Sequence, residues 1–133
     1  MSGPLAVEPI MQKDSGDCGA ASLAMYLSIP YRQVCDAALK VVPDFFNHGM
    51  TRGEMVTVAR LLGYDLKRSA KFNLEEDNGV MFMHYRKSYH AVLLFGGVLI
   101  NPSDGLIWLP EAYINKSHFK PVTLLHTVDT PPK

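Results

Sequence analysis

The period of the hydrophobic pattern changes once along this chain, at about Tyr64. Before that point apolar residues recur at helical spacing, and after it they form short β-branched and aromatic runs. The pattern predicts helices at about 18–28, 31–41 and 51–63, the last with a capping box formed by Thr51 and Glu54. It predicts strands at 64–68, 80–85, 90–95, 98–101, 106–109 and 122–128, and no element between the last two. Helices followed by strands indicate an α+β fold, with N-terminal helices packed on one face of a C-terminal antiparallel sheet.

Length and composition indicate one domain and give no sign of a nucleic-acid or membrane partner. A chain of 133 residues suits a single domain over 1–133, with an extended arm at 1–11 and a tail at 129–133. Thirteen basic and thirteen acidic residues cancel, so the charge favours neither nucleic acid nor an anionic membrane. The N-terminus has no secretory signal, and the longest nearly apolar run, 91–100, is too short to span a bilayer. Two cysteines in such a chain indicate free thiols, and we expect a soluble, cytoplasmic protein.

A cysteine stands where a polar turn meets the first predicted helix. Cys18 follows the good N-cap residues Asp14, Ser15 and Asp17. In the first turn of a helix, free backbone N–H groups and the helix dipole favour a thiolate over a thiol. Gln12, six residues upstream, carries an amide that can donate hydrogen bonds to an oxyanion. The pattern is typical of a nucleophile with an oxyanion donor beside it, although an isolated helix cysteine more often only packs.

A glycine pair at Gly96-Gly97 predicts a two-residue hairpin between the strands at 90–95 and 98–101. Pairing outward from this turn puts His90 and Asn101 on one face, roughly 6–8 Å apart at Cβ and within reach of a hydrogen bond. Such a bond would orient the ring of a histidine base. We expect the helix that carries Cys18 to pack on this same face.

The remaining polar residues receive weaker roles. Asp104 is a possible substitute for Asn101, but the pairing puts it on the other face and in a turn. Cys35 lies within the second predicted helix and is interpreted as a structural thiol. Histidines 48, 84, 118 and 126 do not lie at metal-ligand spacing with the cysteines, so no metal is expected.

These motifs resemble those of a known family. Gln12, the run 17–19 (Asp-Cys-Gly) and the helix after it are similar to the opening motif of the C39 peptidases. These are papain-like cysteine proteases, best known as leader-removing domains of bacteriocin exporters. The run 90–94 (HAVLL), followed by Asn101-Pro102, is similar to the family's histidine strand and Asp-Pro segment. The similarity covers roughly residues 8–127.

The resemblance implies a fold, a set of roles and a substrate class. It implies a papain-like peptidase in which Cys18 is the nucleophile, His90 the general base and Asn101 the residue that orients His90. Gln12 would form the oxyanion hole, and no cofactor or metal is needed. The substrate would be a peptide or protein cleaved after small residues such as Gly-Gly.

One departure from the family pattern keeps an alternative open. Asn101 stands where exporter-linked C39 peptidases have aspartate. Papain-like enzymes use asparagine in this role, but a neutral amide stabilises an imidazolium less than a carboxylate does. The alternative is a catalytically weak or inactive C39-like module that binds a peptide or protein. Such a module could be a component of a larger assembly, for example a phage particle.

Overall fold

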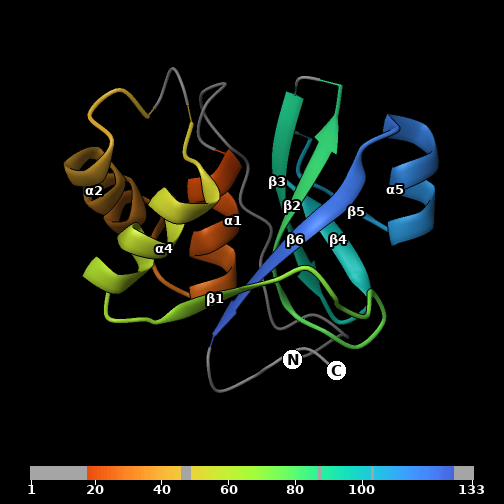
Figure 1. Cartoon of the computed structure of the whole chain (residues 1–133), viewed down its shortest axis with the longest axis horizontal. Coiled ribbons are helices and arrows are strands. Elements are labelled where there is room, and N and C mark those ends of the chain that lie inside the picture. The colour runs from red at the N-terminus through yellow and green to blue at the C-terminus, as the bar shows by residue number, and fades with distance from the viewer. Residues whose placement is uncertain (1–17, 46–48, 87, 103, 128–133) are drawn as a thin grey trace.

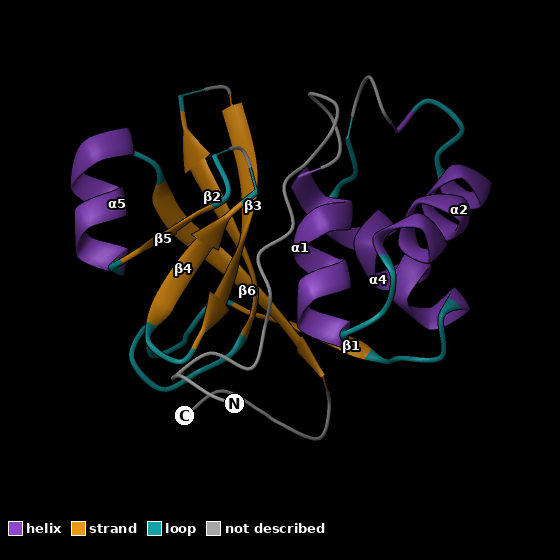
Figure 2. Cartoon of the chain, turned by 180° about the vertical axis from the view of Figure 1, so that it is seen from behind, coloured by secondary structure: helices purple, strands orange, loops and turns teal. Residues whose placement is uncertain are grey.

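The computed structural model describes residues 18–45, 49–86, 88–102 and 104–127. Among these described residues, the first elements are the helices α1 (Cys18–Leu27), α2 (Tyr31–Val41) and α4 (Arg52–Leu61). The strands β1 (Leu66–Ser69), β2 (Gly79–Tyr85), β3 (Ser88–Phe95), β4 (Val98–Asn101) and β5 (Leu106–Trp108) follow, and α5 (Pro110–Ser117) and β6 (Lys120–Thr127) complete the order. All strand pairs are antiparallel, in one six-stranded sheet of order β1-β6-β2-β3-β4-β5 (Figures 1 and 2). The α+β architecture predicted from the sequence is confirmed.

The predicted helix signals act as expected. The Thr51 hydroxyl accepts a hydrogen bond from the Glu54 backbone N–H at 3.1 Å, and the Glu54 carboxylate accepts one from the Thr51 N–H at 2.8 Å. These two bonds form the capping box that starts α4. Gly63 follows α4 with φ of 94°, a left-handed conformation that ends the helix at little cost for glycine. Among the helices that the structure describes, none combines the length and apolar character needed to cross a membrane.

The glycine hairpin has the predicted register. Gly96 and Gly97 have φ of 60° and 81°, as a type I′ turn requires at both central positions. Phe95 therefore pairs with Val98, and pairing continues outward to Leu93 and Ile100. The two-residue connection fixes which residues of β3 and β4 share a face.

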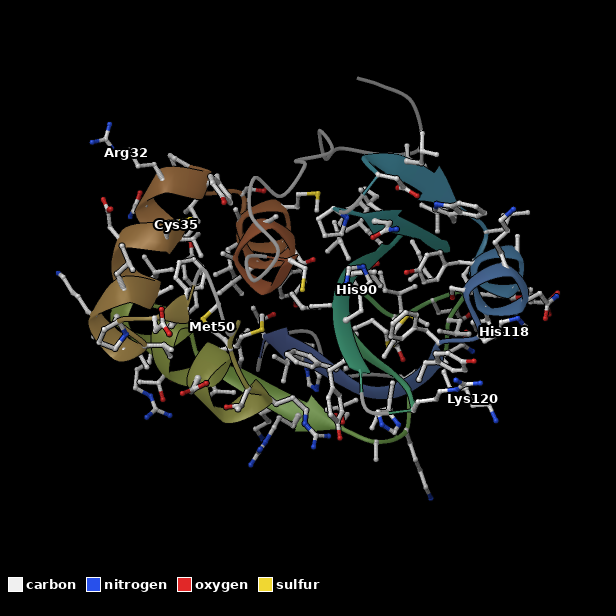
Figure 3. All side chains as sticks on the ribbon, turned by 90° about the horizontal axis from the view of Figure 1, so that it is seen from above. Arg32, Cys35, Met50, His90, His118 and Lys120 are labelled. Atoms are coloured by element: carbon white, nitrogen blue, oxygen red, sulfur yellow. The ribbon has the colours of Figure 1, made fainter. Side chains whose placement is uncertain are left out.

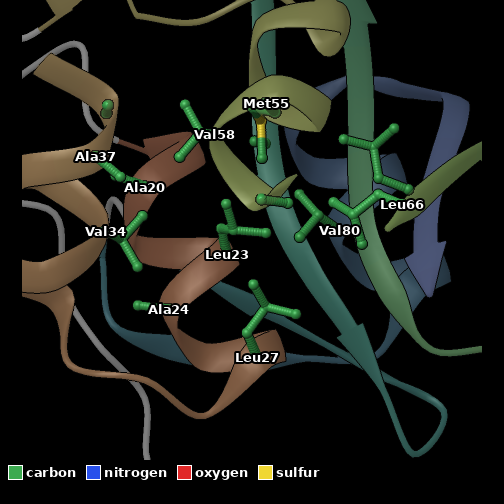
Figure 4. Close-up of a cluster of buried hydrophobic side chains, with 14 of the residues drawn as sticks. Ala20, Leu23, Ala24, Leu27, Val34, Ala37, Met55, Val58, Leu66 and Val80 are labelled. Atoms are coloured by element: carbon green, nitrogen blue, oxygen red, sulfur yellow. The ribbon is translucent and has the colours of Figure 1, made fainter. Parts of the chain in front are cut away.

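The sheet has a buried apolar cluster on each side. Helices α1, α2 and α4 cover one face, whereas α5 lies on the other (Figure 1). Figure 4 shows the helix-side cluster, in which Leu23 of α1, Val34 of α2 and Met55 of α4 pack together with Val80 of β2. The second cluster joins strand residues to α5 and consists of Met81, Met83, Val92, Leu94, Leu99, Tyr113 and Leu124.

Helix α5 was not predicted, and its sequence explains why. Of its eight residues, PEAYINKS, only Tyr113 is buried. One buried residue produces no recurring apolar spacing, so the segment has no detectable helical period. Pro110 at the first position is the remaining helix signal, because its fixed φ suits the first turn of a helix.

The prediction of which face α1 covers was wrong. Met25 of α1 packs with Leu93 and Ile100. Side chains alternate between the two faces along a strand, so these two residues point to the face opposite that of His90 and Asn101. His90 and Asn101 therefore share the face that holds the cluster around α5. Register arithmetic shows which side chains lie together, but it does not show which face a helix layer will cover.

Candidate active site

His90 and Asn101 form the predicted hydrogen bond. The His90 Nε2 atom lies 2.7 Å from the Asn101 Oδ1 atom. The two residues come from β3 and from the last position of β4, so the hairpin brings them together. Asn101 is only 6% exposed. The ring of Phe119 packs against the His90 ring, with 5.7 Å between the two ring centres. The bond is thus short and largely shielded from water.

This contact determines the tautomer of His90. An amide oxygen can only accept a hydrogen bond. Nε2 of His90 therefore carries the ring proton and donates a hydrogen bond to the Asn101 oxygen. Nδ1 is then the nitrogen that can accept a proton from an acid. Burial lowers the pKa of His90 below its ordinary value of 6.5, while the hydrogen bond that His90 donates to Asn101 and the charge of Asp104 oppose that effect. The ring is therefore held as a neutral base at neutral pH.

Asp104 lies in a turn, as predicted, and its charge acts on the site. The Gly105 N–H donates to the Asn101 carbonyl at 2.8 Å, which closes the turn after β4. The Asp104 carboxylate accepts from the Leu106 N–H at 2.8 Å and from the Trp108 indole N–H at 3.1 Å. Two donors thus fix this carboxylate close to the residue that orients His90. The predicted position of Asp104 on the other face of the hairpin argued against direct contact with His90. A charge, however, acts through space as well as through contact.

Cys18 is the first residue of α1 and is half-buried. Four residues later, the Ser22 hydroxyl donates to the Ala91 carbonyl of β3 at 3.2 Å. One helical turn is about 5.4 Å and a strand rises about 3.3 Å per residue, so Cys18 lies about two residues nearer the start of β3. That position is the level of Tyr89 and His90.

Tyr113 also places Cys18 in this neighbourhood. Burial raises the pKa of Tyr113 to about 12, and the negative charges of Asp104 and of the Cys18 thiolate contribute to that rise. Asp104 acts in the same way on His90. Cys18 and Asp104 thus lie close enough to Tyr113 to interact with it electrostatically, and Asp104 also interacts with His90. No pattern in the sequence pointed to Tyr113, because it lies on helix α5, whose helical period is too weak to detect.

The first turn of α1 is closely packed on its other side. A Cβ atom added at Gly19 would lie 3.0 Å from the Met55 sulfur and 3.6 Å from the Met50 methyl carbon. A side chain at this position would force the flexible end of Met55 to shift by a few tenths of an ångström. Gly19 therefore lets the helix end that carries Cys18 approach the methionines closely.

The other candidate residues lie elsewhere. Cys35 is 6% exposed and belongs to the core cluster around α2, and Figure 3 shows it on the far side of α1 from His90. This placement agrees with a structural thiol. Gln12, the predicted oxyanion donor, lies outside the described residues, as does His48. Among the described residues, no group of three or more His, Cys, Asp or Glu side chains could hold a metal ion.

Comparison with known proteins identifies a structural relative. No protein-family model and no curated protein matches this chain. The structure is similar to a crystal structure of a double-glycine-motif protease from an AMS/PCAT transporter, solved in complex with the leader peptide. The TM-score is 0.63 at 25% sequence identity, and the match covers 91% of this chain and 90% of that one. The fold is therefore of the papain-like C39 type.

Proposed function

We propose that this chain is a cysteine peptidase that cleaves a peptide bond after small residues, with Cys18 and His90 as its catalytic residues and Asn101 as the residue that positions His90. The observation that carries the proposal is the 2.7 Å hydrogen bond between His90 and Asn101, on a strand against which the Cys18 helix packs. The structural similarity to a double-glycine protease supports the class of reaction and of substrate.

The proposed reaction begins with transfer of the Cys18 proton to Nδ1 of His90, which gives a thiolate and an imidazolium. The thiolate attacks the scissile carbonyl carbon, and the tetrahedral oxyanion receives hydrogen bonds from the Cys18 backbone N–H and the Gln12 amide. His90 then donates its proton to the leaving amine, and the C–N bond breaks to leave a thioester on Cys18. Water, activated by neutral His90, hydrolyses the thioester and restores the thiol.

Asn101 has a positioning role in this scheme. Its oxygen accepts a hydrogen bond from the Nε2–H group of His90 throughout the cycle. Nδ1 therefore remains the nitrogen that exchanges protons with Cys18 and the substrate. The amide is neutral, and it stabilises the imidazolium through a hydrogen bond without a full opposite charge.

The test is cleavage of synthetic peptides that contain a Gly-Gly pair, followed by mass spectrometry of the products. We expect the wild type to cleave after the pair, Cys18→Ala to be inactive and Cys35→Ala to remain active. Equal activity of Cys18→Ala and the wild type would refute the nucleophile assignment. Absence of cleavage by the wild type, with peptide binding retained by Cys18→Ala, would instead identify a binding module.

A further inference from the structure

A polar pocket lies close to the candidate active site and has no part in the proposed reaction. It has a volume of about 680 Å³ and lies between the end of β2, the turn after it, the C-terminal half of α5 and the start of β6. Four of the residues that line it are histidine, arginine or lysine: His84, Arg86, His118 and Lys120. Figure 3 shows His118 and Lys120 together on the α5 side of the molecule.

The charge of this pocket is one-sided. None of the described residues that line it is acidic, although the whole chain contains equal numbers of acidic and basic residues. His84 pairs directly with Lys120 across the sheet. Among the described residues, neither Arg86 nor Lys120 forms a salt bridge with an aspartate or glutamate. A bound anion would supply Arg86 and Lys120 with an opposite charge.

The backbone holds two of the basic residues in an uncommon conformation. Arg86 has φ of 55° and His118 has φ of 66°, both in the left-handed region. A residue with a Cβ atom enters this region at a cost of roughly 1–2 kcal/mol, and such residues concentrate at functional sites. The Arg86 guanidinium lies 5.1 Å from the centre of the Tyr85 ring, and the His118 ring lies 6.0 Å from it. Tyr85 therefore brings both basic groups to the same pocket.

One aromatic side chain connects this pocket to His90. The Phe119 ring lies 5.7 Å from the His90 ring and 6.1 Å from the Tyr85 ring. These two distances limit the separation of the His90 and Tyr85 rings to about 12 Å, which an extended peptide covers in about four residues. A peptide that passes His90 can therefore place a side chain in the pocket.

We propose that this pocket binds an acidic side chain of the peptide substrate, at a position within roughly six residues of the scissile bond. This inference rests on the proposed peptidase function. The guanidinium of Arg86 presents paired N–H donors that match the two oxygens of a carboxylate, and Lys120 adds a second permanent positive charge. The pocket would thus select substrates by charge at a distance from the Gly-Gly pair.

The binding test uses the Cys18→Ala protein, which leaves the peptide intact, and fluorescent peptides that contain one Gly-Gly pair. Each peptide carries a single Glu or its matched Gln at one of six positions on either side of the pair, and amidated C-termini exclude a terminal carboxylate as the ligand. We expect Glu to bind about 3- to 10-fold more tightly than Gln at one position or two adjacent positions. This preference should weaken as salt is raised from 0.05 to 0.5 M, because the pocket is open to solvent.

Two further variants assign the preference to the pocket. Arg86→Gln with Lys120→Gln, added to Cys18→Ala, should abolish the preference for Glu and leave the affinity for the Gln peptide unchanged. Lys67→Gln is the matched control, because it removes an exposed positive charge from β1, where Lys67 pairs with His126 at the opposite end of β6 from Lys120. Absence of a Glu preference at every position, or a preference that survives the double substitution, would overturn the proposal.

The same peptides separate this proposal from the peptidase function. If the wild type cleaves the Gly-Gly peptides without distinguishing Glu from Gln, the pocket proposal fails and the peptidase proposal stands. If the wild type cleaves none of them while the Glu preference is present and depends on Arg86 and Lys120, the peptidase proposal fails and the pocket remains an acidic-peptide site.

Discussion

Substitution of Asn101 is expected to lower turnover by a predictable amount. In Asn101→Ala, the Nε2 proton of His90 loses the acceptor that lies 2.7 Å away. Asn101 is 6% exposed and Phe119 covers the histidine ring, so water cannot replace the amide freely. A buried donor left without its partner costs about 1–3 kcal/mol. If that cost falls on the transition state, kcat/KM decreases about 5- to 150-fold.

Asn101→Asp is expected to have the opposite effect. A carboxylate accepts the same hydrogen bond and adds a negative charge next to the imidazolium, so turnover should be retained or increased. The pKa of His90 should also rise, because the charged form of the ring gains an opposite charge. Cleavage of a Gly-Gly peptide measures the first effect, and the NMR titration of the His90 ring protons measures the second.

The control for this series lies at the other end of the same hairpin. The Asn78 side chain accepts a hydrogen bond from the Gly96 N–H at 3.0 Å, so Asn78→Ala also removes one side-chain hydrogen bond from the hairpin. It should reduce stability without reducing kcat/KM. The reasoning would be refuted if Asn101→Ala retained full turnover in folded protein, or if Asn78→Ala lost as much activity as Asn101→Ala.

Three other predictions concern charge and packing. Asp104→Asn should lower the pKa of His90 further, because the Asp104 charge raises it, and an unchanged ring titration by NMR would contradict this. Since burial holds the pKa of His90 below 6.5, the unfolded chain binds more protons below that value, so stability should fall as the pH decreases from 7 to 5. His90→Gln should make that fall shallower in urea unfolding, and equal slopes would argue against it. Gly79→Ala should lower the free energy of unfolding by about 1–3 kcal/mol, because the added Cβ would overlap the Leu125 carbonyl. Gly53→Ala in α4 should be neutral or stabilising by up to about 1 kcal/mol, because its added Cβ meets no close atom and alanine favours a helix. Equal denaturation midpoints for the two alanine variants would refute this packing argument.

Local signals in the sequence were sufficient for much of the fold. Gly96-Gly97 can form a tight hairpin turn, and that turn alone fixes the register that places His90 beside Asn101. The capping box at Thr51 and Glu54 likewise fixes the start of α4. These features depend on residues close together in the chain, so their physics is contained in a short segment.

The features that the sequence did not reveal depend on tertiary packing. The side of the sheet that α1 covers is decided by which cluster fills each face, as the contact of Met25 with Leu93 shows. The effect of Asp104 on His90 depends on a turn held by Trp108, four residues further along the chain. Tyr113 reaches the site from a helix with a single buried residue. None of these relations leaves a periodic pattern or a motif in the sequence.

The central claim is that Cys18 is a nucleophile activated by His90, and covalent trapping tests it most directly. A peptidyl chloromethyl ketone that ends in Gly-Gly should alkylate the wild type once, and peptide mapping by mass spectrometry should place the adduct on Cys18. The rate should decrease about 10²- to 10⁴-fold in His90→Ala, which lacks the base that generates the thiolate. Cys35→Ala should react as the wild type does. An adduct on Cys35, or an equal rate of Cys18 labelling in His90→Ala, would contradict the account.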